Sequence, residues 1–153
     1  MGNLGVSELL LILILLGVLL VPGIFFLLTL QKALSRCSPE SRTMPPEQVW
    51  FLLIPIFNFV WQFIVVSRLA SSLGNEFRRR NLVKEPEPGK SLGLVFCILD
   101  LCGIIPVLGI FASLAGLACW IMYWVKISNY SAELALQSAA QSPATSPRQQ
   151  TPI

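Results

Sequence analysis

Between Leu9 and Leu30 the chain has 22 consecutive residues without a charged side chain, and 18 of them are Leu, Ile, Val or Phe. Each of these 18 side chains favours insertion into a bilayer by roughly 0.3 to 0.6 kcal/mol. A cleavable signal peptide has a basic start and an apolar core of about 7–15 residues. The segment from Met1 to Glu8 has no Lys or Arg, and the core is longer than that. The block is therefore predicted to be a retained membrane helix.

The composition of the chain indicates an integral membrane protein of one domain. Hydrophobic residues make up 54% of the 153 residues and charged residues 12%, whereas an ordinary soluble domain has about 25% charged residues. The apolar residues stand in long blocks and do not follow the periods of amphipathic helices or strands. We therefore expect an all-α membrane helical bundle, with residues 1–130 as the multi-pass transmembrane domain.

Four transmembrane helices are predicted, at about 9–30, 49–66, 90–105 and 108–127. The last two come from an apolar stretch between Ser91 and Lys126, which is too long for a single span of a hydrocarbon core of about 30 Å. Pro106 and Gly109 near its middle can break the helix, so these two spans are expected to form a short hairpin. Residues 131–153 are mostly Ala, Gln, Ser, Pro and Thr and are predicted to be a disordered tail.

The Lys and Arg residues predict an orientation, because cytoplasmic loops are enriched in them. With four spans, eight lie on the side of the two termini and three, Lys32, Arg36 and Arg42, lie on the other side. Both termini are therefore expected in the cytoplasm. An alternative stays open: if residues 49–66 enter the membrane and return, all eleven share one side and the N-terminus lies opposite. Pro55 permits such a break, although re-entrant backbone must be buried in protein.

Three polar residues inside the predicted spans are candidates for chemistry. Asp100 is the only acidic residue deep in a span, where a charged side chain costs about 2.5–3.5 kcal/mol to insert. Asn58 and Gln62 lie four residues apart, on one helical face. The functional interpretation is an ion or proton path or a ligand contact. The structural alternative is a protonated or hydrogen-bonded Asp100 that links two helices, with Asn58 or Gln62 as its partner.

Small side chains mark one face of the last predicted span. They recur at helical spacing and let another helix backbone approach closely. The residues are Gly109, Ala112, Ser113 and Gly116. This face is predicted to be a helix-packing motif, used for packing against itself or against a larger membrane complex.

Basic and aromatic residues mark the expected membrane surfaces. Arg78, Arg79 and Arg80 follow the second span and suit an anionic leaflet, either as a positively charged flank or as a specific lipid site. Aromatic side chains close to Lys126 are expected to form a belt at the level of the headgroups. They are Trp120, Tyr123 and Trp124, with Trp50 in the same role on the second span.

The sequence offers no set of residues for catalysis or for a cofactor. It contains no histidine, and its four cysteines form no CxxC pair and no metal-ligand spacing. No nucleophile elbow, zinc-binding HExxH, phosphate loop or dinucleotide-binding glycine pattern occurs. We therefore expect a protein that is not an enzyme, without a metal, a cofactor or a nucleic-acid partner.

Three stretches resemble a known kind of protein: Trp50-Phe-Leu-Leu-Ile-Pro-Ile-Phe-Asn-Phe-Val-Trp-Gln-Phe63, Leu69-Ala-Ser-Ser-Leu-Gly-Asn-Glu-Phe77, and the block from Lys90 to Lys126. They are similar to small bacterial multi-pass membrane proteins grouped as domains of unknown function, in which an Ile-Pro-x-x-Asn membrane segment precedes a helical pair. The resemblance covers roughly residues 45–130. It implies a bacterial inner-membrane protein with about four helices, and it implies no activity or site residue.

Two functions are consistent with these features. The first is a non-enzymatic accessory or assembly subunit, which packs its helices against itself or against other membrane proteins within a lipid bilayer. The second is a small transporter or oligomeric channel that uses Asp100, Asn58 and Gln62. The first is preferred because small-residue faces and little extramembrane mass favour it.

Overall fold

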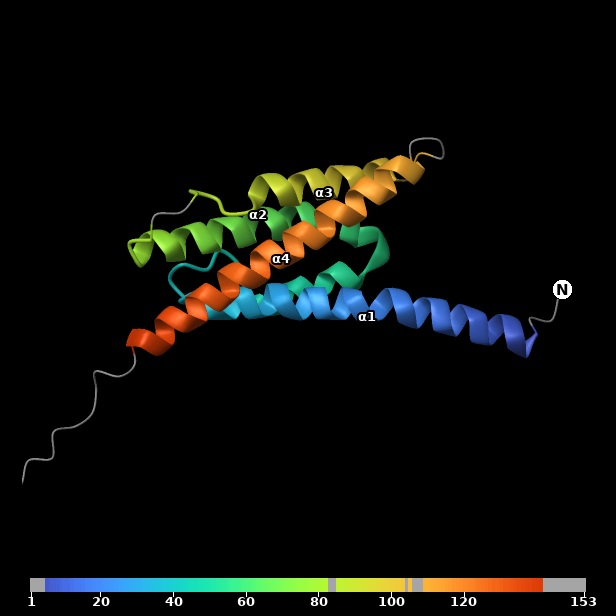
Figure 1. Cartoon of the computed structure of the whole chain (residues 1–153), viewed down its shortest axis with the longest axis horizontal. Coiled ribbons are helices and arrows are strands. Elements are labelled where there is room, and N and C mark those ends of the chain that lie inside the picture. Colours follow the sequence, from blue (N-terminus) through green and yellow to red (C-terminus); the bar gives the residue numbers. More distant parts are fainter. Residues whose placement is uncertain (1–4, 83–84, 104, 106–108, 142–153) are drawn as a thin grey trace, which may run out of the picture.

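The computed structural model describes residues 5–82, 85–103, 105 and 109–141, and this part of the chain contains helices and no strand (Figure 1). Its elements are α1 (Val6–Arg36), the 3-10 helix η1 (Pro46–Leu53), α2 (Pro55–Arg79), α3 (Lys90–Cys102) and α4 (Gly109–Gln141). The prediction of an all-α protein is confirmed.

Three helices are long and apolar enough to cross a membrane, where four were predicted. They are α1, α2 from Ile56 onward, and α4. Helix α3 has only 13 residues, so it is about 20 Å long and falls short of a hydrocarbon core of about 30 Å. The three helices are consistent with a multi-pass integral membrane protein.

The predicted second span, residues 49–66, is not one helix. Its backbone breaks at Ile54 (φ −82°, ψ 109°), where η1 ends and α2 begins with Pro55. Proline has no amide hydrogen and disfavours a helical residue before it, so it suits the first position of a helix and ends the preceding one. Helices η1 and α2 run in opposite directions and form a hairpin beside α1 (Figure 1).

Helix α4 continues through the first part of the predicted disordered tail. It ends at Gln141, and its Ser131 and Leu134 are buried. The extension is ordered because it packs against the end of α2: Arg80 donates a hydrogen bond to the carbonyl oxygen of Leu134 at 3.1 Å. The prediction of disorder is therefore wrong for residues 131–141, and residues 142–153 lie outside the described residues.

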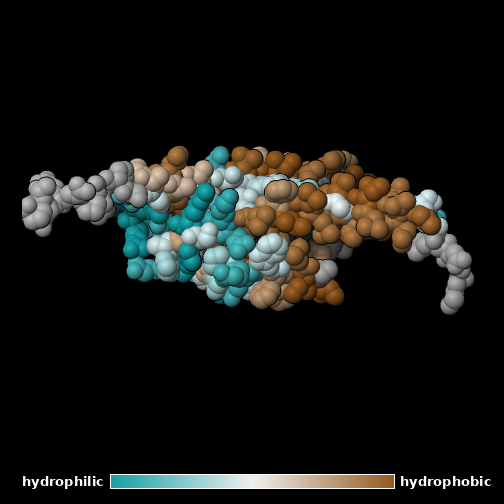
Figure 2. All heavy atoms as spheres, turned by 90° about the horizontal axis from the view of Figure 1, so that it is seen from below, coloured by the Kyte–Doolittle hydropathy of each residue, from teal (hydrophilic) through white to brown (hydrophobic). Residues whose placement is uncertain are grey.

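Polar and apolar side chains are separated along the long axis of the molecule (Figure 2). We call one part the apolar half; it comprises residues 6–28 of α1, 51–62 of η1 and α2, 95–103 of α3 and 109–122 of α4. Most of its large apolar side chains are exposed. We call the other part the polar end; it comprises residues 36–48, 68–82, 85–90 and 126–141. The closed hydrophobic core lies towards this end, between α1, α2 and α4.

The two polar loops lie together at the polar end. Arg79 forms an ion pair of 2.8 Å with Glu40, and Asn75 donates a hydrogen bond to the carbonyl oxygen of Ser41. The four-span arrangement puts these loops on opposite sides of a membrane, so these contacts contradict it. They fit the alternative in which residues 49–66 enter the membrane and return.

Candidate functional site

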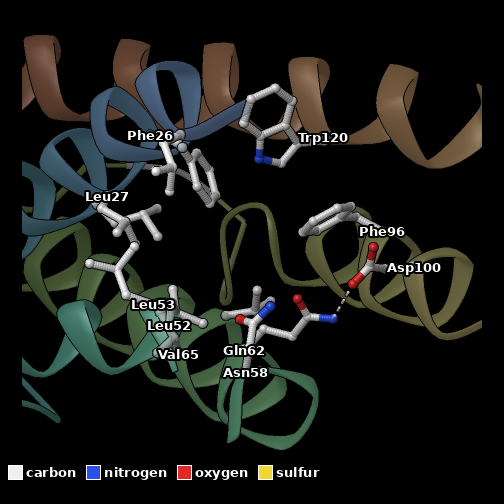
Figure 3. A pocket seen from close by; sticks show the side chains of 14 residues that line it. Phe26, Leu27, Leu52, Leu53, Asn58, Gln62, Val65, Phe96, Asp100 and Trp120 are labelled. Carbon is white, nitrogen blue, oxygen red and sulfur yellow. Dashed lines mark hydrogen bonds between the residues drawn. The ribbon is translucent and has the colours of Figure 1, made fainter. Parts of the chain in front are cut away.

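A cavity of about 230 Å³ lies in the apolar half, where α1, η1, α2, α3 and α4 meet (Figure 3). Its walls are mainly apolar and aromatic, and three polar side chains line it. These are Asp100, Asn58 and Gln62, which the sequence singled out. The structure therefore brings all three candidate polar residues to one cavity.

Asp100 and Gln62 are in direct contact. The Nε2 amide of Gln62 donates a hydrogen bond to Oδ2 of Asp100 at 3.3 Å, which joins α2 to α3 (Figure 3). This distance lies just beyond the usual range of 2.7–3.2 Å, so the bond is a weak one. Gln62 is buried, whereas the Asp100 side chain is not covered by protein. The hydrogen-bonded link that the structural interpretation of Asp100 requires is therefore present.

Asn58 lies one helical turn before Gln62 on α2, with its carboxamide in the cavity (Figure 3). Among the described residues this carboxamide has no hydrogen-bond partner. The helix that carries both amides begins at Pro55, so the break before that proline sets where they face. A ligand in the cavity therefore has a free amide donor and acceptor within its walls.

Aromatic side chains form the wall on the side of α1 and α4. The rings of Phe26 and Trp120 meet edge to face with centroids 5.4 Å apart, and Phe96 of α3 lines the same cavity. Edge-to-face rings at this spacing attract each other weakly beyond their burial. Phe26 also contacts Tyr123 and Trp124, so the wall is fixed from behind.

A second cavity of about 430 Å³ lies beside the first. Asp100 and Trp120 line both of them, and Ser113 and Gly116 of α4 line only the second. The carboxyl group therefore stands at the boundary of two spaces in a region where nearly all other side chains are apolar.

Two tryptophans from other helices form hydrogen bonds to neighbouring turns of α1. Trp124 donates its indole N–H to Oγ1 of Thr29 at 2.9 Å, and Trp50 donates to Oε1 of Gln31 at 3.0 Å. Tryptophan with a satisfied N–H is typical of the border between hydrocarbon and headgroups. These two positions fit the predicted aromatic belt. Tyr123 does not, because it is buried in the core and its hydroxyl has no partner among the described residues.

The small-residue face of α4 packs within the chain. Gly109, Ala112 and Gly116 are buried, and a Cβ atom built on Gly116 would lie 3.6 Å from Cβ of Leu99 on α3. Ser113, the fourth member, is exposed. The prediction of close helix packing thus has its partner in α3 of the same chain.

The three arginines after the second span differ in their contacts. Arg80 bonds to Glu76 at 2.8 Å and is largely buried, so it stabilises the polar end and does not face lipid. Arg78 and Arg79 are exposed, and Arg79 also pairs with Glu40. Only these two remain available to lipid headgroups.

Glu76 is an organising residue that the sequence analysis missed. It is 2% exposed and accepts hydrogen bonds from Ser38 and Arg80. The helical spacing in the sequence could have indicated its burial, because Glu76 lies three residues after Leu73 and seven after Leu69 and so falls on their buried face. Burial beside this carboxylate also raises the pKa of the Cys37 thiol to about 12.

Metal binding has no support from the described residues, since no three His, Cys, Asp or Glu side chains among them are grouped to hold an ion. The fold and the cavity define a class: a small helical protein with three candidate membrane-spanning helices and a polar contact inside its apolar half. Comparisons with protein families, with curated proteins and with solved structures gave no match to this chain. The resemblance to bacterial membrane proteins of unknown function therefore stays a prediction.

Proposed function

We propose that this chain is a non-enzymatic accessory or assembly subunit of a membrane complex, and that it acts by helix packing in the lipid bilayer. The observation that carries the proposal is the exposure of the apolar side chains in the first half of α1. Its side chains from Leu9 to Leu16 are each at least 50% exposed, while the second half of the same helix is packed into the core. The first half therefore has an apolar surface on all sides for another transmembrane helix.

The aromatic belt, which meets α1 at Thr29 and Gln31, supports a placement of this helix in the membrane. From Val6 to Thr29 this helix has 24 residues, which span about 36 Å and so cross a core of about 30 Å. In this proposed placement only α1 crosses the membrane completely. The hairpins η1–α2 and α3–α4 enter from the side of the polar end and return to it, although α2 and α4 are long enough to cross. At the turn of the first hairpin, the Ile54 amide donates to the carbonyl oxygen of Phe51 and the Ile54 carbonyl oxygen accepts from the Asn58 amide, so both backbone groups of Ile54 are paired, as backbone inside a membrane requires.

This placement puts the N-terminus on the side of the membrane opposite the cytoplasm, whereas the four-span prediction put it in the cytoplasm. All nine Lys and Arg residues among the described residues lie towards the polar end, and the remaining two, at positions 84 and 148, are outside that part. Because basic residues concentrate in the cytoplasm, the polar end and the end of α4 are cytoplasmic and the N-terminus is on the far side. The resemblance favours a bacterial inner membrane. The polar end then exposes Arg78 and Arg79 to anionic lipid.

Helix packing can be tested by photocrosslinking along α1 in intact membranes. A photoreactive amino acid is placed at each position from Leu9 to Leu16 in turn, with buried Leu34 as the control that contacts only its own chain. A partner helix gives crosslinks to protein that peak every 3.6 residues, because one helical face meets the partner. Absence of protein crosslinks at all of these positions would mean that α1 meets only lipid and would overturn the proposal.

A small transporter or oligomeric channel is the second candidate function, and the cavity favours it. Asp100, Asn58 and Gln62 all line this space, and intramembrane carboxylates often mark transport paths. Flux of an ion into liposomes that disappears in Asp100→Asn, with unchanged protein insertion, would decide for this function over the accessory role.

A further inference from the structure

We infer that the cavity between α1, α2, α3 and α4 is a binding site for a hydrophobic organic cation, whose charge sits beside Asp100 and whose apolar part contacts Phe26, Phe96 and Trp120. This site is independent of the proposed packing of α1, because it uses the opposite half of that helix and the three helices behind it.

Within the described part of the chain, the carboxyl group of Asp100 has no cationic partner. Its Oδ2 accepts one weak hydrogen bond from a neutral amide, and its Oδ1 accepts none among the described residues. No Lys or Arg lines either cavity that Asp100 borders. An ionised carboxylate in an apolar surrounding is unfavourable unless a positive charge compensates it. A ligand cation supplies that charge.

The aromatic walls favour the same ligand class. Trp120 and Phe96 border both spaces beside Asp100, and Phe26 lines the first one. The face of an aromatic ring attracts a cation, and tryptophan does so most strongly. Most of the remaining lining, including Leu20, Leu27 and Val65, is aliphatic. Such walls suit an aryl or alkyl group, as in most small-molecule sites.

The negative charge of Asp100 also disfavours some classes of ligand. An anionic amphiphile would meet Asp100 with no Lys or Arg in the lining to offset the repulsion. A neutral hydrocarbon gains only apolar contact. The site therefore selects for positive charge, and this selection, rather than binding as such, is what an experiment has to measure.

A matched pair of ligands isolates the charge. Benzyltrimethylammonium and neopentylbenzene have the same shape, and they differ by a nitrogen cation in place of a quaternary carbon. Binding of both is measured on the full chain in lipid nanodiscs, with empty nanodiscs to subtract partition into lipid. We expect saturable binding of the cation at one site per chain, at least tenfold tighter than that of the hydrocarbon.

Variants then assign the selection to one side chain. Asp100→Asn keeps the shape and should lower cation affinity at least tenfold, while hydrocarbon affinity stays the same. Asp100→Glu keeps the charge and should retain the preference for the cation. Glu8→Gln removes a carboxylate near the far end of α1, outside the cavity, and should leave both affinities unchanged. Trp120→Leu should lower the affinity for the cation more than the affinity for the hydrocarbon.

Several outcomes would overturn the inference. Equal affinity for cation and hydrocarbon means that charge is not recognised. Unchanged cation affinity in Asp100→Asn, or a loss in Glu8→Gln as large as that in Asp100→Asn, means that general electrostatics and not this site attract the ligand. Uptake that equals that of empty nanodiscs means that the cavity binds neither probe.

Discussion

The backbone N–H of Ser38 donates a hydrogen bond of 3.0 Å to Oε2 of Glu76, although 38 positions separate the two residues. The hydroxyl of Ser38 donates to the same oxygen, and Arg80 bonds to the other carboxylate oxygen at 2.8 Å. The loop after α1 is thereby fastened to the end of α2. This contact puts both polar loops at one end of the molecule, which is the basis for the membrane placement proposed above.

The first prediction concerns this buried carboxylate. Glu76→Ala should lower the free energy of unfolding by about 3–5 kcal/mol, because it removes the carboxylate that balances the charge of Arg80 in a largely buried position. Glu40→Ala is the control: it removes an exposed partner of Arg79 and should cost less than about 1 kcal/mol. Denaturant unfolding in detergent micelles, followed by tryptophan fluorescence, measures both. Equal effects of the two substitutions would contradict the buried network.

The second prediction tests the close approach of α3 to its neighbours. A Cβ atom on Gly93 would lie 2.5 Å from Cγ1 of Val66 and 2.9 Å from the ring of Tyr123. Gly93→Ala should therefore destabilise the protein by about 1–3 kcal/mol, as overpacking does. At Gly23 a Cβ atom meets nothing within 4 Å, so Gly23→Ala should be neutral or stabilising by about 0.5–1 kcal/mol. Thermal unfolding of the two variants in one detergent compares them, and a loss at Gly23 as large as at Gly93 would refute the packing.

The third prediction separates two members of the small-residue face. Gly116→Leu should disrupt the α3–α4 hairpin, because this buried position faces Leu99, whereas Ser113→Leu should be tolerated because Ser113 is exposed. Size-exclusion profiles and melting temperatures in detergent measure the difference. Sensitivity at Ser113 instead would mean that this side of α4 meets another protein.

The fourth prediction concerns Cys37 at the polar end. Burial beside Glu76 raises its pKa from 9.0 to about 12, so the thiol stays protonated in the folded state where an exposed thiol ionises. Its contribution to stability is therefore complete below pH 9 and is lost as the pH rises from 9 towards 12. In a variant with Cys37 as its only cysteine, alkylation at pH 9 should be slow until the protein unfolds. Rapid alkylation of the folded protein would show that this end is open.

The helical class and the three polar residues that line the cavity were recognisable in the sequence because both depend on local signals. Long apolar blocks identify membrane helices, and polar side chains inside them are conspicuous. The break at Ile54 was harder to predict, since a proline can either kink a helix or start one. The packing of η1 on α1 decides between a kinked helix and two separate helices. The extension of α4 to Gln141 depends on Arg80, 54 positions before Leu134, and no local pattern carries such a contact.

The separation of the molecule into an apolar half and a polar end is tested most directly by labelling from the two sides of the membrane. Single cysteines replace exposed Ser7, Glu40 and Asn81 in a chain whose four native cysteines are alanine, and an impermeant maleimide is added to intact or opened cells. The proposed placement predicts that Glu40→Cys and Asn81→Cys react only from the cytoplasmic side and Ser7→Cys only from the outside. Labelling of positions 40 and 81 from opposite sides would contradict the account and restore an arrangement in which residues 49–66 cross the membrane.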